Sequence, residues 1–251
     1  MENWKDFIAH KPGRMLLSVD AYQDWVIWME RENALPRISF MNVNGDTSEI
    51  EMDEEAYGLG VSPSPEFDTN MFRFTYSSPT TPAQVYDYNL DTGERNLLKE
   101  AEIPSGHNSA DFVTRRIQAT SHDGAEVPLT ILYHKDTPLD GSAPCLLYGY
   151  GSYGMSMPAS FSANRLSLVE RGFIYVVAHV RGGEEKGRAW YEDAKFGKKP
   201  NSFHDFIAAG KTLAQENFTS EGNIVIMGGS AGGLLVGASV NMAPDLFAGV
   251  I

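Results

Sequence analysis

The sequence has few of the features that mark a secreted, metal-binding or membrane protein. Its one cysteine, Cys145, excludes an internal disulfide and any cysteine-based metal cluster, and it is typical of a reducing compartment. No apolar run reaches the roughly 18 residues of a membrane span, and Met1-Glu2-Asn3-Trp4-Lys5 does not resemble a signal peptide. EF-hand loops, His-Glu-x-x-His pairs and low-complexity tracts are lacking too, so no cofactor or metal is implied. We expect a cytoplasmic protein without a membrane anchor.

Positive charge is scarce in the first part of the chain. Residues 1–110 hold 8 basic and 19 acidic residues, whereas residues 111–251 hold 12 and 14, and the net charge is −13. An acidic surface repels phosphate, so nucleic acid is not expected as a partner, whereas cationic peptides would be attracted. A surface that merely keeps the protein in solution explains the acidity equally well.

Residues 1–110 have the pattern of antiparallel strands. Short alternating or aromatic runs, at 25–29, 37–41, 72–76 and 85–88, are separated by turn signals at 44–45, 62–65 and 91–93. Two or three propeller blades of about 40–50 residues each fit this pattern, and from composition alone a piece of a β-sandwich fits as well. A Pro-Ser-Gly linker at 104–106 indicates the end of this domain near residue 110.

Residues 111–251 have the pattern of an α/β domain. A hairpin is expected from 114–120 and 127–133, followed by buried strands at 144–148, 173–178 and 224–227. Helices are expected near 162–171, 202–215 and 231–242. Strands that alternate with helices predict a parallel sheet.

The segment Gly228-Gly229-Ser230-Ala231-Gly232-Gly233 follows a strand and opens a helix, which is the layout of a nucleophile elbow. A side chain at position 228 or 232 would collide across so tight a turn. The helix start brings backbone N–H groups to the place where an oxyanion would develop, so Ser230 is a candidate acyl-transfer nucleophile. The alternative, a glycine-rich anion-binding turn, matches neither the dinucleotide nor the phosphate-loop pattern.

A second glycine-rich loop, Gly149-Tyr150-Gly151-Ser152-Tyr153-Gly154, follows the expected strand at 144–148. Loops after the strands of a parallel sheet line its ligand crevice, so a tyrosine there can direct its hydroxyl at a substrate. Such a tyrosine can equally pack as an aromatic side chain on a neighbour.

Four motifs in order, beginning at Tyr148, His179, Trp190 and Gly228, resemble those of the prolyl oligopeptidase family, most closely its oligopeptidase B branch. The resemblance implies the last blades of a β-propeller, residues 1–110, and the first part of an α/β-hydrolase peptidase domain, residues 111–251. It implies a cytosolic serine peptidase that cleaves short peptides after Arg or Lys, with the propeller keeping folded proteins from the site. Ser230 matches the nucleophile, and the backbone N–H of Ala231 and the hydroxyl of Tyr150 match the oxyanion donors.

The general base is missing from this part of the sequence. In this fold the triad follows the order Ser, Asp, His, yet no histidine follows Ser230 and the only later acid is Asp245. Upstream, His179 and His204 are better explained as structural hydrogen-bonding groups than as substitutes. We therefore expect a fragment of a longer enzyme, truncated at both ends, that turns over little or no substrate alone.

Other functions and finer specificity stay open at this stage. An esterase of the same fold would lack the propeller, and a non-catalytic binding piece would carry a vestigial elbow. Pro158 and Ser160 stand where some relatives carry aspartates that bind basic side chains, so the resemblance gives no basis for dibasic selectivity. The acids for the residue before the cut are expected beyond Ile251, and the oligomeric state is not indicated.

Overall fold

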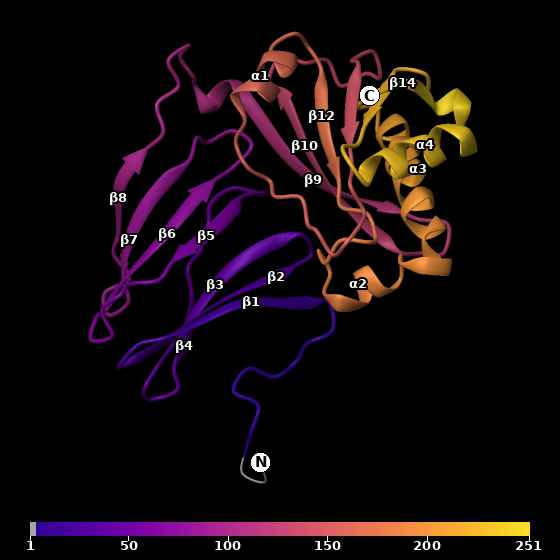
Figure 1. The fold of residues 1–251 in the computed structure, drawn as a ribbon. Coiled ribbons are helices and arrows are strands. Elements are labelled where there is room, and N and C mark those ends of the chain that lie inside the picture. The colour runs from indigo at the N-terminus through magenta and orange to yellow at the C-terminus, as the bar shows by residue number, and fades with distance from the viewer. Residues whose placement is uncertain (1–3) are drawn as a thin grey trace.

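The computed structural model describes residues 4–251, which form three β-sheets (Figure 1). Two of them are four-stranded antiparallel sheets in which each strand pairs with the next along the chain. The antiparallel strands expected in this part are thus confirmed, and the expected turns join neighbouring strands. The first sheet contains β1 (Arg14–Ala21), β2 (Trp25–Glu32), β3 (Leu35–Asn42) and β4 (Thr47–Glu49). The second contains β5 (Gly58–Ser62), β6 (Met71–Ser77), β7 (Gln84–Asn89) and β8 (Arg95–Glu100).

The two antiparallel sheets share one apolar core. Along β6 the side chains alternate, with Phe72 and Phe74 buried and Arg73 exposed, because successive residues of a strand face opposite sides. Ile38 and Phe40 of β3 belong to the same buried cluster. The sheets therefore pack against each other through their apolar faces and lie side by side in Figure 1.

The third sheet has six strands in the order β14-β13-β11-β12-β10-β9. Its strands are β9 (Phe112–Thr120), β10 (Glu126–His134), β11 (Cys145–Tyr148), β12 (Ile174–Ala178), β13 (Ile224–Met227) and β14 (Phe247–Val250). Four of them, β11 to β14, are parallel, as expected. The expected hairpin, β9–β10, joins them through an antiparallel pairing of β10 with β12, so the whole sheet is mixed. Strand β14 was not anticipated from the sequence.

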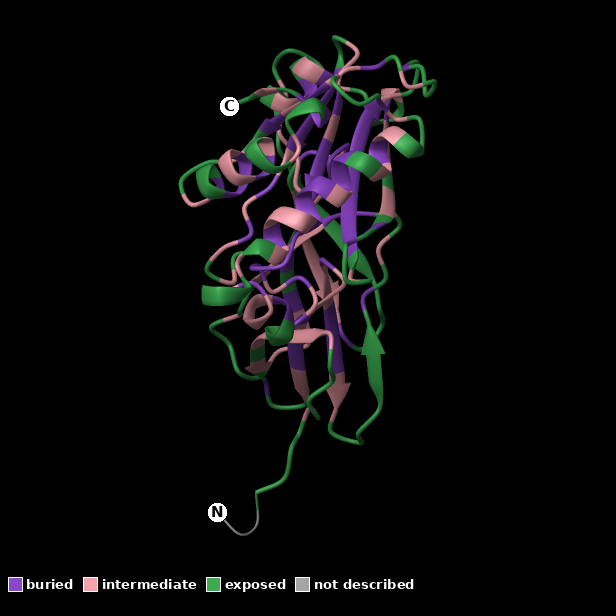
Figure 2. Cartoon of the chain, turned by 90° about the vertical axis from the view of Figure 1, so that its right-hand side faces the viewer, coloured by how far each residue is buried: buried purple, intermediate pink, exposed green. Residues whose placement is uncertain are grey.

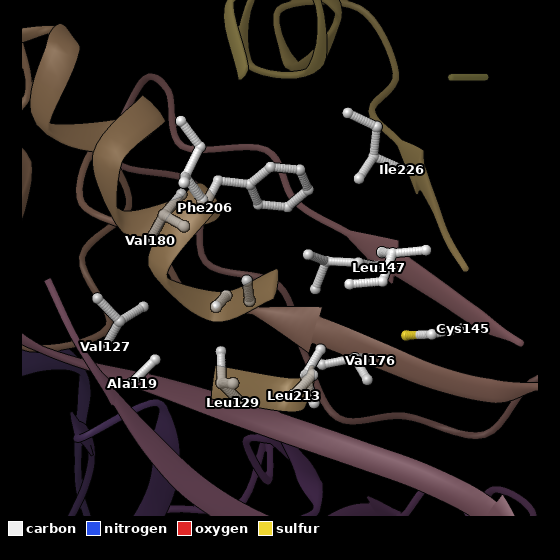
Figure 3. Packing of buried hydrophobic residues seen from close by; sticks show 14 of the residues in the cluster. Ala119, Val127, Leu129, Cys145, Leu147, Val176, Val180, Phe206, Leu213 and Ile226 are labelled. Atoms are coloured by element: carbon white, nitrogen blue, oxygen red, sulfur yellow. The ribbon is translucent and has the colours of Figure 1, made fainter. Parts of the chain in front are cut away.

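Helices cover both faces of this sheet. They are α1 (Ala163–Val169), α2 (Arg188–Glu192), α3 (Pro200–Gln215) and α4 (Gly232–Met242), and short 3₁₀ turns lie at Ser109–Asp111, Phe196–Lys198 and Pro244–Leu246. Figure 2 shows the buried strands between less buried helices. In Figure 3, Phe206 of α3 lies over Leu147 and Ile226 of neighbouring strands. On the other face, Leu166 and Val169 of α1 pack with Leu132.

The first antiparallel sheet contacts the mixed sheet through the tip of the β2–β3 hairpin. Asn33 and Ala34 form this two-residue turn with positive φ angles of 49° and 67°. The N–H of Ala34 donates to the carbonyl of Glu185 at 2.8 Å, in the loop after β12. Nearby, the guanidinium of Arg31 donates to Ser156 Oγ at 2.9 Å. The hairpin tip is therefore fixed to two loops at one edge of the mixed sheet.

Leu147 tests the packing of the mixed sheet, because its side chain is fully buried and its strand, β11, lies between β12 and β13. We expect Leu147→Ala to lower the free energy of unfolding by about 2–5 kcal/mol, since it removes buried methyl groups and leaves a cavity. Urea titration measures the change. Leu98 on β8 is 50% exposed, so Leu98→Ala should stay within about 0.5 kcal/mol of the unsubstituted chain. Equal losses in the two variants would contradict the described core.

Candidate active site

Three loops meet at one edge of the mixed sheet, after the adjacent strands β12, β11 and β13. Tyr148 at the end of β11 pairs with Val177 on one side and Met227 on the other. The N–H of Gly149 extends this pairing and donates to Met227 O at 3.2 Å. Because the three strands are parallel, their carboxyl ends lie together. The loop with Tyr150 is thus placed next to the turn with Ser230.

The turn at Ser230 has the strained geometry of an elbow. Ser230 is exposed and has a φ of +53°, which is uncommon for any residue except glycine. A Cβ atom at Gly228 would lie 2.4 Å from the carbonyl oxygen of Gly232, and one at Gly232 would lie 3.0 Å from that of Gly149. The predicted collision across the turn is therefore confirmed for position 228, whereas the close neighbour of position 232 is the adjacent Tyr150 loop and not the turn itself. Nothing lies within 4 Å of the Cβ position at Gly229 or Gly233, so these two glycines are not required for space.

Ala231 lies directly before the first turn of α4, with a helical φ of −63°. The first N–H groups of a helix have no partner within the helix, and the helix dipole is positive at this end. The N–H groups of Gly232 and Gly233 already donate to the carbonyls of Gly229 and Ser230, so the Ala231 N–H is the backbone donor that an anion beside Ser230 would meet.

Tyr150 lies against the beginning of α4. Its ring carbon Cδ2 and its Cα are both 3.6 Å from the Cβ position at Gly232, two residues after Ser230. The side chain is half-buried. Close packing against the neighbouring helix holds the ring at the elbow, so the structure brings Tyr150, Ser230 and Ala231 together.

A pocket of about 380 Å³ opens beside this constellation. Ala231 and, within α4, Leu234 form one wall. The rest comes from the Tyr150 loop and from residues 182–199, with the aromatic rings of Tyr153, Tyr191 and Phe196 and the ammonium groups of Lys195 and Lys199. Tyr153 and Phe196 are 75% and 88% exposed and have positive φ angles of 58° and 52°. Two left-handed non-glycine residues therefore line the pocket, and a third, Ser230, directly precedes the lining residue Ala231. Such strain concentrates at functional sites.

A cluster of charged side chains holds the loop after β12, which contains Arg181. Arg181, which is 4% exposed, donates two hydrogen bonds to the carboxylate of Asp205, at 2.6 and 2.9 Å. It donates two more to Asp123, at 2.6 and 3.0 Å. Burial alone would lower the pKa of Arg181, but the two carboxylates outweigh it and raise that pKa. The same interaction with Arg181 lowers the pKa of Asp123 to about 2. The guanidinium thus stays charged inside the fold.

Within residues 4–251, none of the contacts that the six histidines make is with Ser230. His179 is buried, and its Nε2 lies 2.9 Å from Thr130 Oγ1, which confirms a structural hydrogen bond. The ring of His204 lies 4.2 Å from that of His122 instead of making such a bond, and burial followed by the His122 charge lowers the pKa of His204. The remaining three are exposed or engaged elsewhere: His10 on the surface, His107 with Thr80, and His134 with Asp136.

Sequence reasoning missed Asp205 and the role of Arg181. Asp205 is fully buried on the inner face of α3, beside Phe206. An acid on the apolar face of an amphipathic helix needs a buried cation, which is the signal that could have revealed the pair. For metals, residues 4–251 contain no group of three or more His, Cys, Asp or Glu side chains that could hold an ion. Nor does this part of the chain contain a helix with the length and apolarity for a membrane crossing.

Comparisons with known proteins agree with this geometry. Residues 159–251 match the description "Prolyl oligopeptidase family", and residues 1–101 match "Prolyl oligopeptidase, N-terminal beta-propeller domain". The chain is 42% identical over 247 residues to dipeptidyl aminopeptidase BI of Pseudoxanthomonas mexicana, covering 98% of this chain and 34% of that protein. It is 40% identical over 240 residues to protease 2 of Moraxella lacunata, covering 96% of this chain and 35% of that protein.

A solved structure, oligopeptidase B from Trypanosoma brucei with covalently bound antipain in a closed form, superposes with a TM-score of 0.89. The identity is 37%, and the match covers 97% of this chain and 36% of that one. The chain therefore spans about a third of the length of the relatives it matches. These matches confirm the expected fold class, β-propeller blades followed by part of an α/β-hydrolase sheet.

Gly228 tests the elbow. We expect Gly228→Ala to lower the free energy of unfolding by about 1–3 kcal/mol, because the added methyl group overlaps the Gly232 carbonyl. Gly233→Ala is the matched control, since its methyl group meets no atom within 4 Å. That control should leave stability unchanged or raise it by up to about 1 kcal/mol, because alanine favours the helix. Chemical denaturation compares the two, and a Gly228→Ala variant as stable as the control would refute the turn geometry.

Asp123 gives a pH-dependent prediction. Its folded-state pKa of about 2 lies below the roughly 3.9 of an unfolded chain. A lowered carboxyl pKa stabilises the fold above about pH 4, and this contribution is lost as the pH falls toward about 2. We expect the Tm difference between wild type and Asp123→Asn to shrink over this range. Thermal unfolding followed by circular dichroism measures it, and a gap that is constant with pH would show that Arg181 does not hold this carboxylate.

Proposed function

The chain belongs to the prolyl oligopeptidase family, and on that premise we propose that it is part of a serine peptidase that cleaves short peptides through an acyl-enzyme at Ser230. One observation carries the proposal. Ser230 is exposed and lies in a left-handed turn between β13 and α4, directly before Ala231 and the first turn of α4. The family's curated relatives include enzymes named as peptidases and proteases.

In the proposed reaction, Ser230 Oγ attacks the carbonyl carbon of the scissile peptide bond. The carbonyl oxygen then carries a negative charge, and the Ala231 N–H and the Tyr150 hydroxyl are the donors that stabilise it. Preorganised donors of this kind lower the activation barrier by about 3–4 kcal/mol each. Collapse of the tetrahedral intermediate expels the amine and leaves the acyl group on Ser230, and water then releases it.

The general base is proposed to come from outside residues 1–251. A serine hydroxyl is a weak nucleophile unless a neighbouring base takes its proton. Within residues 4–251 no histidine is hydrogen-bonded to Ser230, which supports a base from another part of the protein. We infer that residues 1–251 alone have little or no peptidase turnover. We infer that the acidic partner of the base also comes from outside residues 1–251.

Cleavage after Arg or Lys is the proposed specificity. Support comes from the likeness to oligopeptidase B and from the acidity of residues 1–110, which favours the approach of cationic peptides. Pro158 and Ser160 provide no carboxylate next to the Tyr150 loop, so selectivity for paired basic residues is not proposed. We also keep as proposals the domain division near residue 110 and, from the lone Cys145, a cytoplasmic location.

A second candidate is the release of dipeptides from peptide N-termini, which the name of the Pseudoxanthomonas mexicana relative favours. Mass spectra of a digested peptide separate the two, because internal cuts and successive dipeptide losses give different products. An esterase of the same fold is less favoured, since residues 1–101 match a propeller domain of peptidases. A non-catalytic role is less favoured, because it would not explain the strained backbone at Ser230.

Ser230 provides the direct test. In the complete gene product, a fluorophosphonate probe should label Ser230, and Ser230→Ala should abolish labelling and lower amidase activity by ~10⁴-fold or more, because the nucleophile is gone. Ser167→Ala, at an exposed position of α1, is the control and should label normally. Mass spectrometry of the labelled peptide identifies the site. Labelling that persists in Ser230→Ala would disprove the assignment.

A further inference from the structure

Lys199 is a half-buried lysine that lines the pocket beside the elbow. Three lysines occupy the stretch before α3, and two of them are paired on the surface: Lys195 with Glu192, and Lys198 with Asp193 at 2.7 Å. Within residues 4–251, no carboxylate oxygen lies within salt-bridge distance of Lys199. Burial lowers the pKa of Lys199, and no neighbouring acid opposes that effect.

The position of Lys199 is unfavourable for a cation in a second way. Lys199 is the residue directly before Pro200, the first residue of α3. The N-terminal end of a helix carries a partial positive charge, so a second positive charge there is destabilising. A desolvated ammonium group at this place needs strong compensating contacts.

The contacts of the ammonium group are with the Tyr150 loop and with the first turn of α3. The ammonium group donates to the carbonyl oxygen of Gly151, to Ser152 Oγ at 3.0 Å and to Ser202 Oγ at 3.3 Å. Three acceptors satisfy all three N–H groups of a lysine. Lys199 therefore has no donor left for a substrate, although its side chain lines the pocket beside Ala231.

Gly151 directly follows Tyr150, and its backbone is tightly constrained. Its φ is +64°, and a Cβ there would lie 2.8 Å from Val180 Cγ2. The loop is tied at its start by the bond from Gly149 to Met227, and at its end by the bond from Gly154 N to Gly182 O at 2.9 Å. Between these two ties, the contact of Lys199 with Gly151 O holds the middle of the loop, next to Tyr150.

We propose that Lys199 is a positioning residue for the oxyanion donor: it holds the Gly151 carbonyl and thereby fixes the Tyr150 hydroxyl beside Ser230. This inference rests on the proposed function of Ser230 and Tyr150. The lysine acts through Tyr150 and not on the substrate, so it affects the rate of the chemical step and leaves ligand binding unchanged.

The test is a double-mutant cycle in the complete gene product, with fluorophosphonate inactivation of Ser230 resolved into kinact and KI. Lys199→Met keeps the length of the side chain and removes the donors. It should lower kinact by about tenfold with KI unchanged, which is less than the ~10²–10³-fold cost of losing an oxyanion donor. In the Tyr150→Phe background, Lys199→Met should lower kinact by less than about twofold further, because the group that it positions is already gone.

The control is Lys198→Met, a neighbouring lysine that is bonded to Asp193 on the surface and does not line the pocket. Its kinact should equal that of the wild type. The proposal would be overturned if Lys199→Met lowered kinact no more than Lys198→Met does. It would also be overturned if Lys199→Met caused an equal loss of kinact with Tyr150 and with Phe at position 150, or if only KI changed. If the wild-type protein does not label at Ser230, the proposed function itself fails, which is a separate result.

A second variant keeps the test valid if Lys199→Met does not fold. Ser152→Ala removes one of the three acceptors of the ammonium group and leaves the lysine in place. It should lower kinact about two- to threefold when Tyr150 is present and leave it unchanged in the Tyr150→Phe background. If Lys199→Met does not fold and Ser152→Ala has the same kinact as the wild type, the proposed positioning role is overturned.

Discussion

The buried ion pair between Arg181 and Asp205 is the contact on which the rest of the site depends. It joins the loop after β12 to the inner face of α3, which also packs on the sheet through apolar side chains. Asp205 also accepts the backbone N–H of Arg181, and Ser202 Oγ donates to the Arg181 carbonyl at 2.6 Å. A buried pair is stable only when its remaining polar atoms are satisfied, and these bonds supply that condition. The loop after β12 is thereby rigid enough to support the loop that carries Tyr150.

The features that the sequence revealed are those with local causes. The glycine at 228 follows from the steric limits of one tight turn, and strands such as 145–148 follow from runs of buried apolar residues. Family motifs added the proposed roles of Tyr150 and Ala231, which no local pattern specifies. The choice between propeller blades and a β-sandwich also needed the family, because alternation along a strand is the same in both folds.

The features that the sequence did not reveal depend on contacts between distant segments. Strand β14 has only four residues and an exposed Ala248, so its apolar signal is weak, and it forms by pairing with β13. Arg181 and Asp205 are 24 residues apart, and Lys199 meets Gly151 across 48 positions. Pairings of this kind require the sheet order, which places β12 beside β11, before the residues can be recognised as partners.

The backbone angle at Ser230 also limits which amino acids can replace the serine. Threonine carries the same hydroxyl, but a β-branched side chain at a φ of +53° is a steric outlier, since its second branch crowds the backbone. Cysteine has an unbranched Cβ like that of serine and can adopt the angle. The backbone angle of the elbow thus restricts the nucleophile by the shape of its side chain, whatever its reactivity. This fold can accommodate cysteine in place of serine at position 230, but it cannot accommodate threonine.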